Sequence, residues 1–202
     1  MTNRTPERVA PEGRGDRRRA ELLQAAMDCV AREGWPGLTH RKVAQHAGAN
    51  AGLVHYYFGN LAGLRSAIAR HASDHLILPV AEALCATTTV DQLIHTAVQI
   101  TEASLDDPDG VRLLTQMITG AAHYPDVAAV VAADMTAAKA RFAGHLVDLD
   151  SEWSMPGAIT AAGLFIGALD GIVLHALTFG PDAAAPAAQL ERLFRAVLTA
   201  PR

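Results

Sequence analysis

The sequence predicts an all-α protein, and three observations support this fold class. Half of the 202 residues are apolar, which is enough for one or two small domains with packed cores. Alanine, the strongest helix former, occupies 40 positions. No long stretch alternates apolar and polar residues with the period of two that is typical of a half-buried strand. A secreted, collagen-like or β-sandwich protein is therefore disfavoured.

Cysteine usage and charge narrow the class further. The two cysteines, Cys29 and Cys85, are too few for a disulfide framework and indicate a reducing compartment. Residues 1–70 hold 11 Lys and Arg against 6 Asp and Glu, whereas residues 71–202 hold 6 against 15, so the net charges are +5 and −9. A basic first third on an acidic body predicts that one end meets a polyanion. Because no apolar segment follows the arginine-rich start, we expect no signal peptide and a cytoplasmic protein.

The first helices can be placed from their end signals. Residues 1–15 combine prolines, glycines and charges without an apolar period, which predicts a flexible basic arm. A first helix should begin near Asp16 and end at Gly34, a residue suited to a left-handed stop.

Two short helices should follow. Thr39 is a good N-cap for a second helix that ends at Gly48, and Asn50 is a good N-cap for a third that ends at Gly59. Residues 47–50 join them, so the pair forms a helix-turn-helix.

Six longer helices complete a total of about nine, with prolines at most of their ends. We expect them over residues 61–78, 89–105, 109–119, 125–148, 156–179 and 187–199.

The segment 157–179 is long and apolar enough to span a bilayer. It contains Asp170 and His175 and has no basic flank, which disfavours a membrane span without removing that alternative. Three glycines recur every four residues and would let a second helix approach closely: Gly163, Gly167 and Gly171. The favoured interpretation is a helix buried on one side by its own core and on the other by a partner subunit.

Basic residues crowd the start of the second predicted helix, where His40, Arg41 and Lys42 stand in a row. Cations are unfavourable at this positive end of the helix dipole. Their presence is understandable if a phosphate lies nearby, and the alternative is that all three are simply solvated.

The third predicted helix carries three consecutive rings, His55, Tyr56 and Tyr57. One helix cannot bury all three on one face, so one or two should be exposed. Exposed Tyr and His can bond phosphates or pack against sugars and thymine methyl groups. The alternative is an aromatic core cluster.

On these motifs, residues 17–65 resemble the DNA-binding domain of the TetR/AcrR family of bacterial transcriptional regulators. The stretch 167–171, followed by Gly180 and Pro181, is similar to the helix through which two subunits of many members pack. The residues that carry the N-terminal resemblance are Arg19, Leu22, Leu23, Ala25, Ala26, Glu33, Gly34, Trp35, Thr39, Arg41, Val43, Ala44, Ala47, Gly48, Gly52, Val54, Tyr56, Phe58 and Leu64.

The resemblance implies a ligand-responsive repressor that binds a palindromic operator as a homodimer and is released by a small, mostly apolar effector of unknown identity. Residues 16–60 would be the helix-turn-helix DNA-binding domain, and residues 61–202 the helical effector-binding and dimerisation domain. Expected contacts to double-stranded DNA are Thr39, Arg41, Lys42, Asn50, Ala51, Gly52, Leu53, His55, Tyr56 and Tyr57.

Three positions depart from the family pattern: His55, Tyr57 and Leu61. Leu61 replaces a lysine that usually contacts a phosphate, and the loss of this cation should remove one counterion-releasing contact per subunit. The arginines at positions 14, 17, 18 and 19 are candidates to compensate.

Polar or adaptable residues on otherwise apolar helices are candidates for the effector pocket. They are Gln116, Met117, His123, Tyr124, Phe142, His145, Phe165 and Asp170. The expected dimer interface comprises Gly163, Gly167, Gly171, His175, Leu190 and Phe194.

Two alternatives stay open. A helical dimer of the same fold that has lost DNA binding would act as a small-molecule or metal-binding protein. His71 and His75, with Asp74 nearby, have the spacing to share a metal, but a third ligand is missing and a solvated helix face is favoured. No phosphate loop, Cys-x-x-Cys pair or nucleophile elbow occurs, so we expect no enzyme, no cofactor and no metal.

Overall fold

The all-α prediction is confirmed for residues 13–180 and 187–198, which are the residues that the computed structural model describes. A short 3₁₀ turn, Trp35–Gly37, follows the first helix. The α-helices are α1 (Arg14–Glu33), α2 (His40–His46), α3 (Ala51–Phe58), α4 (Leu61–Ala72), α5 (Leu78–Cys85), α6 (Val90–Leu105), α7 (Pro108–Ala121), α8 (Pro125–Leu149), α9 (Met155–Phe179) and α10 (Ala187–Leu198).

The prediction that a helix ends at residue 78 is wrong. A π-helical segment, Ser73–Ile77, carries the chain from α4 into α5 without a break, so the described ranges hold nine helical rods. The backbone N–H of Leu78 donates to the carbonyl of Ser73. Pro79 then lies in the first turn of α5, where a residue without a backbone N–H is tolerated. The wider π turn before it accommodates the proline without breaking the rod.

The start of α1 also differs from the prediction. The helix begins at Arg14 after Gly13, and no side chain caps it, whereas Asp16 was the expected start. Two residues of the predicted arm, Arg14 and Gly15, are therefore helical, and residues 1–12 lie outside the described residues. The remaining boundaries of the predicted domains stay predictions.

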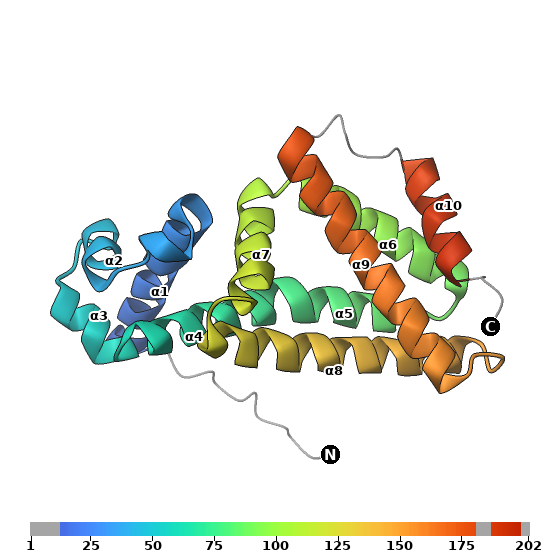
Figure 1. Cartoon of the computed structure of the whole chain (residues 1–202), viewed down its shortest axis with the longest axis horizontal. Coiled ribbons are helices and arrows are strands. Elements are labelled where there is room, and N and C mark those ends of the chain that lie inside the picture. Colours follow the sequence, from blue (N-terminus) through green and yellow to red (C-terminus); the bar gives the residue numbers. More distant parts are fainter. Residues whose placement is uncertain (1–12, 181–186, 199–202) are drawn as a thin grey trace, which may run out of the picture.

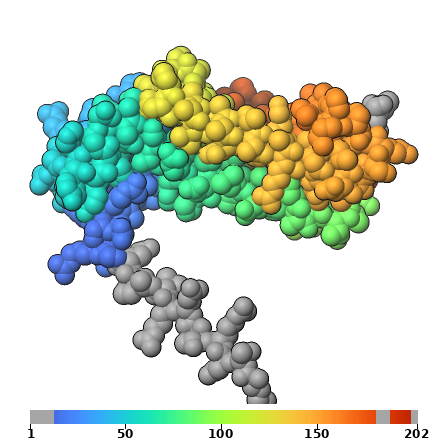
Figure 2. All heavy atoms as spheres, turned by 90° about the horizontal axis from the view of Figure 1, so that it is seen from below, coloured from blue at the N-terminus to red at the C-terminus, as the bar shows by residue number. Residues whose placement is uncertain are grey.

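The helices form an elongated body with α1, α2 and α3 at one end (Figure 1). The rod made by α4 and α5 runs side by side with α8 along the length of the molecule, as the view from below shows (Figure 2). Helix α7 stands against α1, and α9 packs across α8 toward the end that holds α6 and α10 (Figure 1).

Two apolar cores divide the described residues. The first joins α1–α4 with one buried residue of α7, Met117, and two of α8, Val127 and Val131. The second joins α5, α6, α8, α9 and α10, and three phenylalanine rings fill its centre: Phe142, Phe165 and Phe194. Because α7 and α8 contribute to the first core, the three N-terminal helices are packed onto the rest of the chain and do not hang from a linker.

Among the described residues, α9 alone is long and apolar enough to cross a membrane by length and composition. One side of it is fully buried, since Ala158, Ala162 and Phe165 belong to the second core. Core helices of soluble proteins combine length and apolar composition in the same way.

Candidate functional site

Side-chain caps begin both short helices at the end of the body. The Oγ1 of Thr39 accepts the backbone N–H of Lys42 at 3.2 Å and starts α2. The Oδ1 of Asn50 accepts the backbone N–H of Leu53 at 2.8 Å and starts α3. Each bond satisfies one of the orphan N–H groups of a helix N-terminus, so the predicted helix-turn-helix is present with the expected caps.

The turn between α2 and α3 is held from α1. Gly48 adopts a φ of 56°, which favours glycine. The Arg18 guanidinium donates to the carbonyls of Ala47 and Gly48, both at 3.3 Å, and also pairs with Glu21 at 2.6 Å. Arg18 is therefore engaged within the chain and buttresses the turn.

Arg19 is also engaged within the chain. Its guanidinium carbon lies 5.2 Å from the centroid of the Phe58 ring. Of the four arginines that were candidates for extra DNA contacts, Arg14 and Arg17 are exposed on the first turn of α1, and Arg17 has an ion pair to Glu21 at 3.5 Å.

The three rings of α3 diverge, as the sequence predicts. Tyr56 is 79% exposed. Tyr57 is half-buried against the first core and meets the Tyr56 ring edge-on at 5.1 Å between centroids. His55 is exposed, with its ring centroid 5.8 Å from that of His40. This helix thus presents one large aromatic side chain to solvent.

The other predicted DNA contacts differ in their exposure to solvent and in whether another side chain of this chain binds them. Arg41, Ala51 and Gly52 are exposed, and Leu53 is half-buried against the first core. The Lys42 ammonium is paired with the carboxylate of Glu33, which lowers the pKa of Glu33. Lys42 is therefore not a free cation in this structure.

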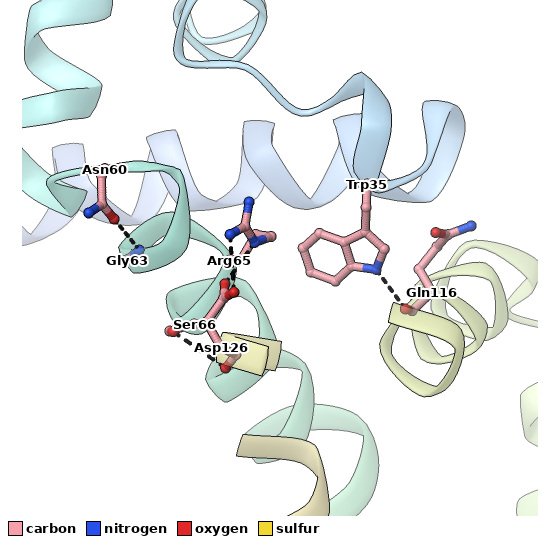
Figure 3. A network of polar contacts seen from close by, with 7 residues as sticks. All are labelled: Trp35, Asn60, Gly63, Arg65, Ser66, Gln116 and Asp126. Atoms are coloured by element: carbon pink, nitrogen blue, oxygen red, sulfur yellow. Dashed lines mark hydrogen bonds and ion pairs between the residues drawn. The ribbon is translucent and has the colours of Figure 1, made fainter. Parts of the chain in front are cut away.

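A polar network joins this end to the rest of the molecule (Figure 3). The Nε1 of Trp35 donates to the carbonyl of Gln116 in α7 at 2.7 Å. The Arg65 guanidinium of α4 binds Asp126 of α8 with two bonds, at 2.7 and 3.0 Å, and both side chains are less than one-fifth exposed. A Cβ at position 120 would lie 2.2 Å from Trp35 Nε1, so the close approach of α7 requires glycine there.

Tyr124 links the two halves of this network. The guanidinium carbon of Arg65 lies 4.7 Å from its ring centroid, and the Trp35 ring centroid lies 5.8 Å from it. Sequence reasoning missed Trp35, Arg65 and Asp126 as a unit because their partners are 61 to 81 residues away in the chain. No local periodicity marks such pairs.

A cavity of about 150 Å³ lies in the second half of the molecule, between α5, α6, α7, α8 and α9. Its wall is mostly apolar. Among the described residues, its polar lining consists of two hydroxyls and two carboxylates, with no Lys, Arg or His: Thr101, Ser104, Asp107 and Asp170. The Thr101 and Ser104 hydroxyls donate to carbonyls of their own helix, both at 2.8 Å, so they offer lone pairs to the cavity. Burial raises the pKa of Asp170.

The predicted pocket residues separate into two groups. Phe142 and Asp170 line the cavity. The other six lie outside its lining, and their role in an effector pocket stays a prediction. Met117 is buried in the first core, and Gln116 and Tyr124 belong to the Trp35 network. His145 contacts the Thr87 hydroxyl, and the Phe165 ring lies between two other phenylalanine rings. His123 is exposed. Polarity on an apolar helix does not reveal which side of the helix faces a void.

The outer face of α9 carries exposed apolar side chains, including Leu164 at 61% and Phe179 at 68% exposure. The predicted interface residues Gly167, Gly171 and His175 are exposed beside them, and Gly163 is half-buried. A Cβ at Gly167 or Gly171 would meet nothing within 4 Å, so both mark open surface.

The prediction that two residues of α10 belong to the dimer interface is wrong. Leu190 and Phe194 are 2% and 0% exposed because they pack into the chain's own second core. The neighbouring Leu193 is a large apolar residue of α10 that reaches solvent. The sequence pattern of an amphipathic helix shows a row of apolar residues but not which partner covers it.

Comparison with known proteins agrees with this geometry. A family model described as "Bacterial regulatory proteins, tetR family" matches residues 22–68. Another, described as "Tetracyclin repressor-like, C-terminal domain", matches residues 88–200.

Curated sequence relatives match over a short segment of the chain. HTH-type transcriptional regulators BetI from Burkholderia cenocepacia and Burkholderia ambifaria are 43% identical over 54 residues, which is 27% of this chain and 28% of theirs. The match thus spans little more than a quarter of the length of these relatives.

Solved structures share the whole fold at low identity. Salmonella enterica GusR superposes with a TM-score of 0.74 at 16% identity, covering 92% of this chain and 97% of that one. A transcriptional regulator from Rhodococcus has a TM-score of 0.72 at 21% identity, with 89% and 93% covered. The multidrug binding protein EbrR, in complex with ethidium, has a TM-score of 0.67 at 24% identity, with 89% and 98% covered. Since a family model covers more than half of the chain, this protein belongs to the TetR family of bacterial regulatory proteins.

Proposed function

We propose that this protein is a transcriptional regulator that binds double-stranded operator DNA through α2 and α3. One observation carries the proposal: the face of the helix-turn-helix that holds Arg41, Gly52 and the 79% exposed Tyr56 is open, while caps and Arg18 hold the helices rigidly from behind. A preformed, open face can enter a major groove without reordering the backbone.

Each side chain has a distinct role in this proposal. The first turn of α3, at Ala51 and Gly52, approaches the base edges, because only small side chains allow close contact. Arg41 reaches a base edge or a phosphate, and the Tyr56 hydroxyl bonds a phosphate. Leu61 is half-buried against the first core, so it replaces a cationic contact with an apolar one.

The active form is a homodimer whose subunits pack through the outer face of α9, helped by Leu193 of α10. The exposed apolar row and the open glycines support this assignment, because an apolar face that water covers in one chain is stabilised by burial against a second. Two recognition helices then read half-sites about 34 Å apart on a palindromic operator.

The cavity beside Asp170 is the proposed effector site. Its mostly apolar wall with a few polar groups suits a small, mostly apolar ligand. A carboxylate that has no ion-pair partner among the described residues, set in an apolar wall, favours a ligand that brings a donor or a positive charge. EbrR, which has the same fold, was solved in complex with ethidium, a cation. That complex supports the choice of a positively charged ligand. We expect the effector to release DNA, so that the protein acts as a repressor.

Fluorescence anisotropy on DNA from upstream of the protein's own gene, at two salt concentrations, tests the proposal. Binding should weaken steeply with salt, and Arg41→Ala or Tyr56→Ala should each weaken it about tenfold or more. Arg141→Ala removes an exposed arginine from α8, far from α3, and should leave affinity unchanged. If folded protein binds neither this DNA nor random DNA at low salt, it is a helical dimer that has lost DNA binding.

A further inference from the structure

Three metal-ligating side chains meet at the junction of α1 and α2. Cys29 and Glu33 lie four residues apart on the last turns of α1, and His46 is the last residue of α2. The Cys29 Sγ lies 2.9 Å from His46 Nδ1, and the ligand atoms of all three residues lie within 4.8 Å of one another. Cys29 is buried, whereas Glu33 and His46 are exposed, so the cluster opens to solvent on one side.

We propose that Cys29, Glu33 and His46 form a site for a thiophilic divalent cation of the zinc class, which bridges α1 and α2. Sulfur, imidazole nitrogen and carboxylate oxygen together are the donor set that Zn²⁺ takes in tetrahedral sites, with water as the fourth ligand. This site lies in the helix-turn-helix, away from the effector cavity.

The geometry needs only a small adjustment. Tetrahedral coordination separates a thiolate sulfur and an imidazole nitrogen by about 3.6 Å, given Zn–S and Zn–N bonds of about 2.3 and 2.1 Å. The Cys29–His46 contact of 2.9 Å must therefore open by about 0.7 Å. His46 is exposed at the end of a helix, so its ring can make this movement while Cys29 stays in the core.

Protonation is also compatible with binding. Burial, followed by the nearby Glu33 charge, raises the pKa of Cys29. A metal bound at His46 Nδ1 would require the imidazole proton on Nε2. When the cation binds, the thiol loses its proton to solvent and the sulfur lone pair forms the metal bond. Nothing is oxidised or reduced, and one proton is released for each bound ion.

Occupancy would change the charge around Lys42. The charges acting on Cys29 come from Glu33, Lys42, Asp28 and Arg32, and Lys42 is paired with Glu33 in this structure. A carboxylate that ligates a cation attracts an ammonium less, so the metal would release Lys42 toward the proposed DNA face. This consequence rests on the proposed function, whereas metal binding itself does not.

Titration of the full, reduced chain with Co²⁺ tests the site, because a cobalt–thiolate bond produces a charge-transfer absorption band. We expect one ion per chain, displacement of Co²⁺ by Zn²⁺, and a higher melting temperature with Zn²⁺. Cys85→Ser is the matched control and should keep the band, whereas Cys29→Ser should lose it. His46→Gln, at an exposed position, should weaken Co²⁺ binding at least tenfold.

Two results would overturn the proposal. One is the absence of a thiolate band in the wild-type chain or its persistence in Cys29→Ser. The other is unchanged Co²⁺ affinity in His46→Gln, which decides the matter if Cys29→Ser does not fold. DNA anisotropy with and without Zn²⁺ is read separately: a chain that binds metal but no DNA contradicts the proposed function and leaves the metal site standing.

Discussion

The two ends of the molecule are stabilised in different ways. At the helix-turn-helix end, α2 and α3 have 7 and 8 residues, which is too short for a helix to persist alone, and individual polar contacts hold them in addition to the first core. At the other end, α8 and α9 have 25 residues each, and the packing of apolar side chains around three phenylalanine rings dominates. The second end also contains a cavity.

This difference suggests that the two ends of the molecule have different functions. Hydrogen bonds such as those of Arg18 to the turn fix a few atoms in one geometry, which suits a surface that must match DNA. An apolar wall around a void can repack at low cost when a ligand enters. The Trp35 and Arg65 contacts connect the two ends, so substitutions there should have the largest effects.

Gly120→Ala should destabilise the protein most. The new Cβ would lie 2.2 Å from Trp35 Nε1, so α7 must move away and the bond to Gln116 is lost. Overpacking and the lost buried bond together should cost about 2–4 kcal/mol of the free energy of unfolding, measured by urea denaturation. Gly144→Ala is the control, because a Cβ there meets nothing within 4 Å. It should stabilise α8 by about 0.5–1 kcal/mol. Equal effects of the two changes would mean that the junction is loosely packed.

Asp126→Asn should have the next largest effect. It breaks a two-bond ion pair whose side chains are 19% and 17% exposed, and it leaves the Arg65 charge poorly solvated. We expect a loss of about 1.5–3 kcal/mol. Glu82→Gln breaks an ion pair at the other end of the molecule, to Arg141 of α8, where both side chains are more than half exposed. That change should stay within about 0.5 kcal/mol. If both variants match the wild type in urea denaturation, the polar junction does not contribute to stability.

Thr39→Ala and Thr89→Ala each remove one helix N-cap, the first from α2 in the helix-turn-helix and the second from α6 at the other end of the molecule. Both hydroxyls accept the N–H of the residue three positions on at 3.2 Å, so each loss should cost about 1 kcal/mol. Only Thr39→Ala should also weaken DNA binding, because this cap begins α2, which carries Arg41 of the proposed DNA face. Thermal melts and anisotropy on the same samples separate the two effects. An equal loss of DNA affinity in Thr89→Ala would show that general stability, not local geometry, controls binding.

Sequence reasoning performed differently at the two ends for a physical reason. Thr39, Gly48 and Asn50 act within four residues of their own positions, so their roles were predictable and the structure contains them. The cavity depends on which sides of five helices face one another, and only Phe142 and Asp170 of the predicted lining are part of it.

The same limit explains the misplaced helix end and interface residues. The predicted helix end at residue 78 is wrong because a π turn, Ser73–Ile77, carries the chain past Pro79 into α5, and no local residue pattern marks such a turn. Leu190 and Phe194 belong to an apolar row that could face a partner or the chain's own core, and tertiary contacts decide for the core.

Asp170→Asn should have the smallest effect, and its pH dependence tests the nature of the cavity. Burial raises the pKa of Asp170 in the folded chain above its unfolded value. Below the pKa that Asp170 has in the unfolded chain, the carboxyl is protonated in both the folded and the unfolded state. Its ionisation then does not affect the free energy of unfolding. As the pH rises through the folded pKa, the carboxyl must ionise in apolar surroundings, so the wild type loses stability that the uncharged amide of the variant retains.

The variant should therefore melt with the wild type in acid and above it at neutral pH, in thermal scans between about pH 4 and pH 8. Glu102→Gln, an exposed change on α6, should show no such divergence. A variant that melts below the wild type at neutral pH would mean that the ionised carboxylate is stabilised by a partner, and the cavity would then be polar where the structure makes it apolar. Divergence in the expected direction would instead identify Asp170 as a charge held at a cost in stability. That cost is understandable where a ligand supplies the missing positive group, so the same variant should lose affinity for cationic ligands while gaining stability without them.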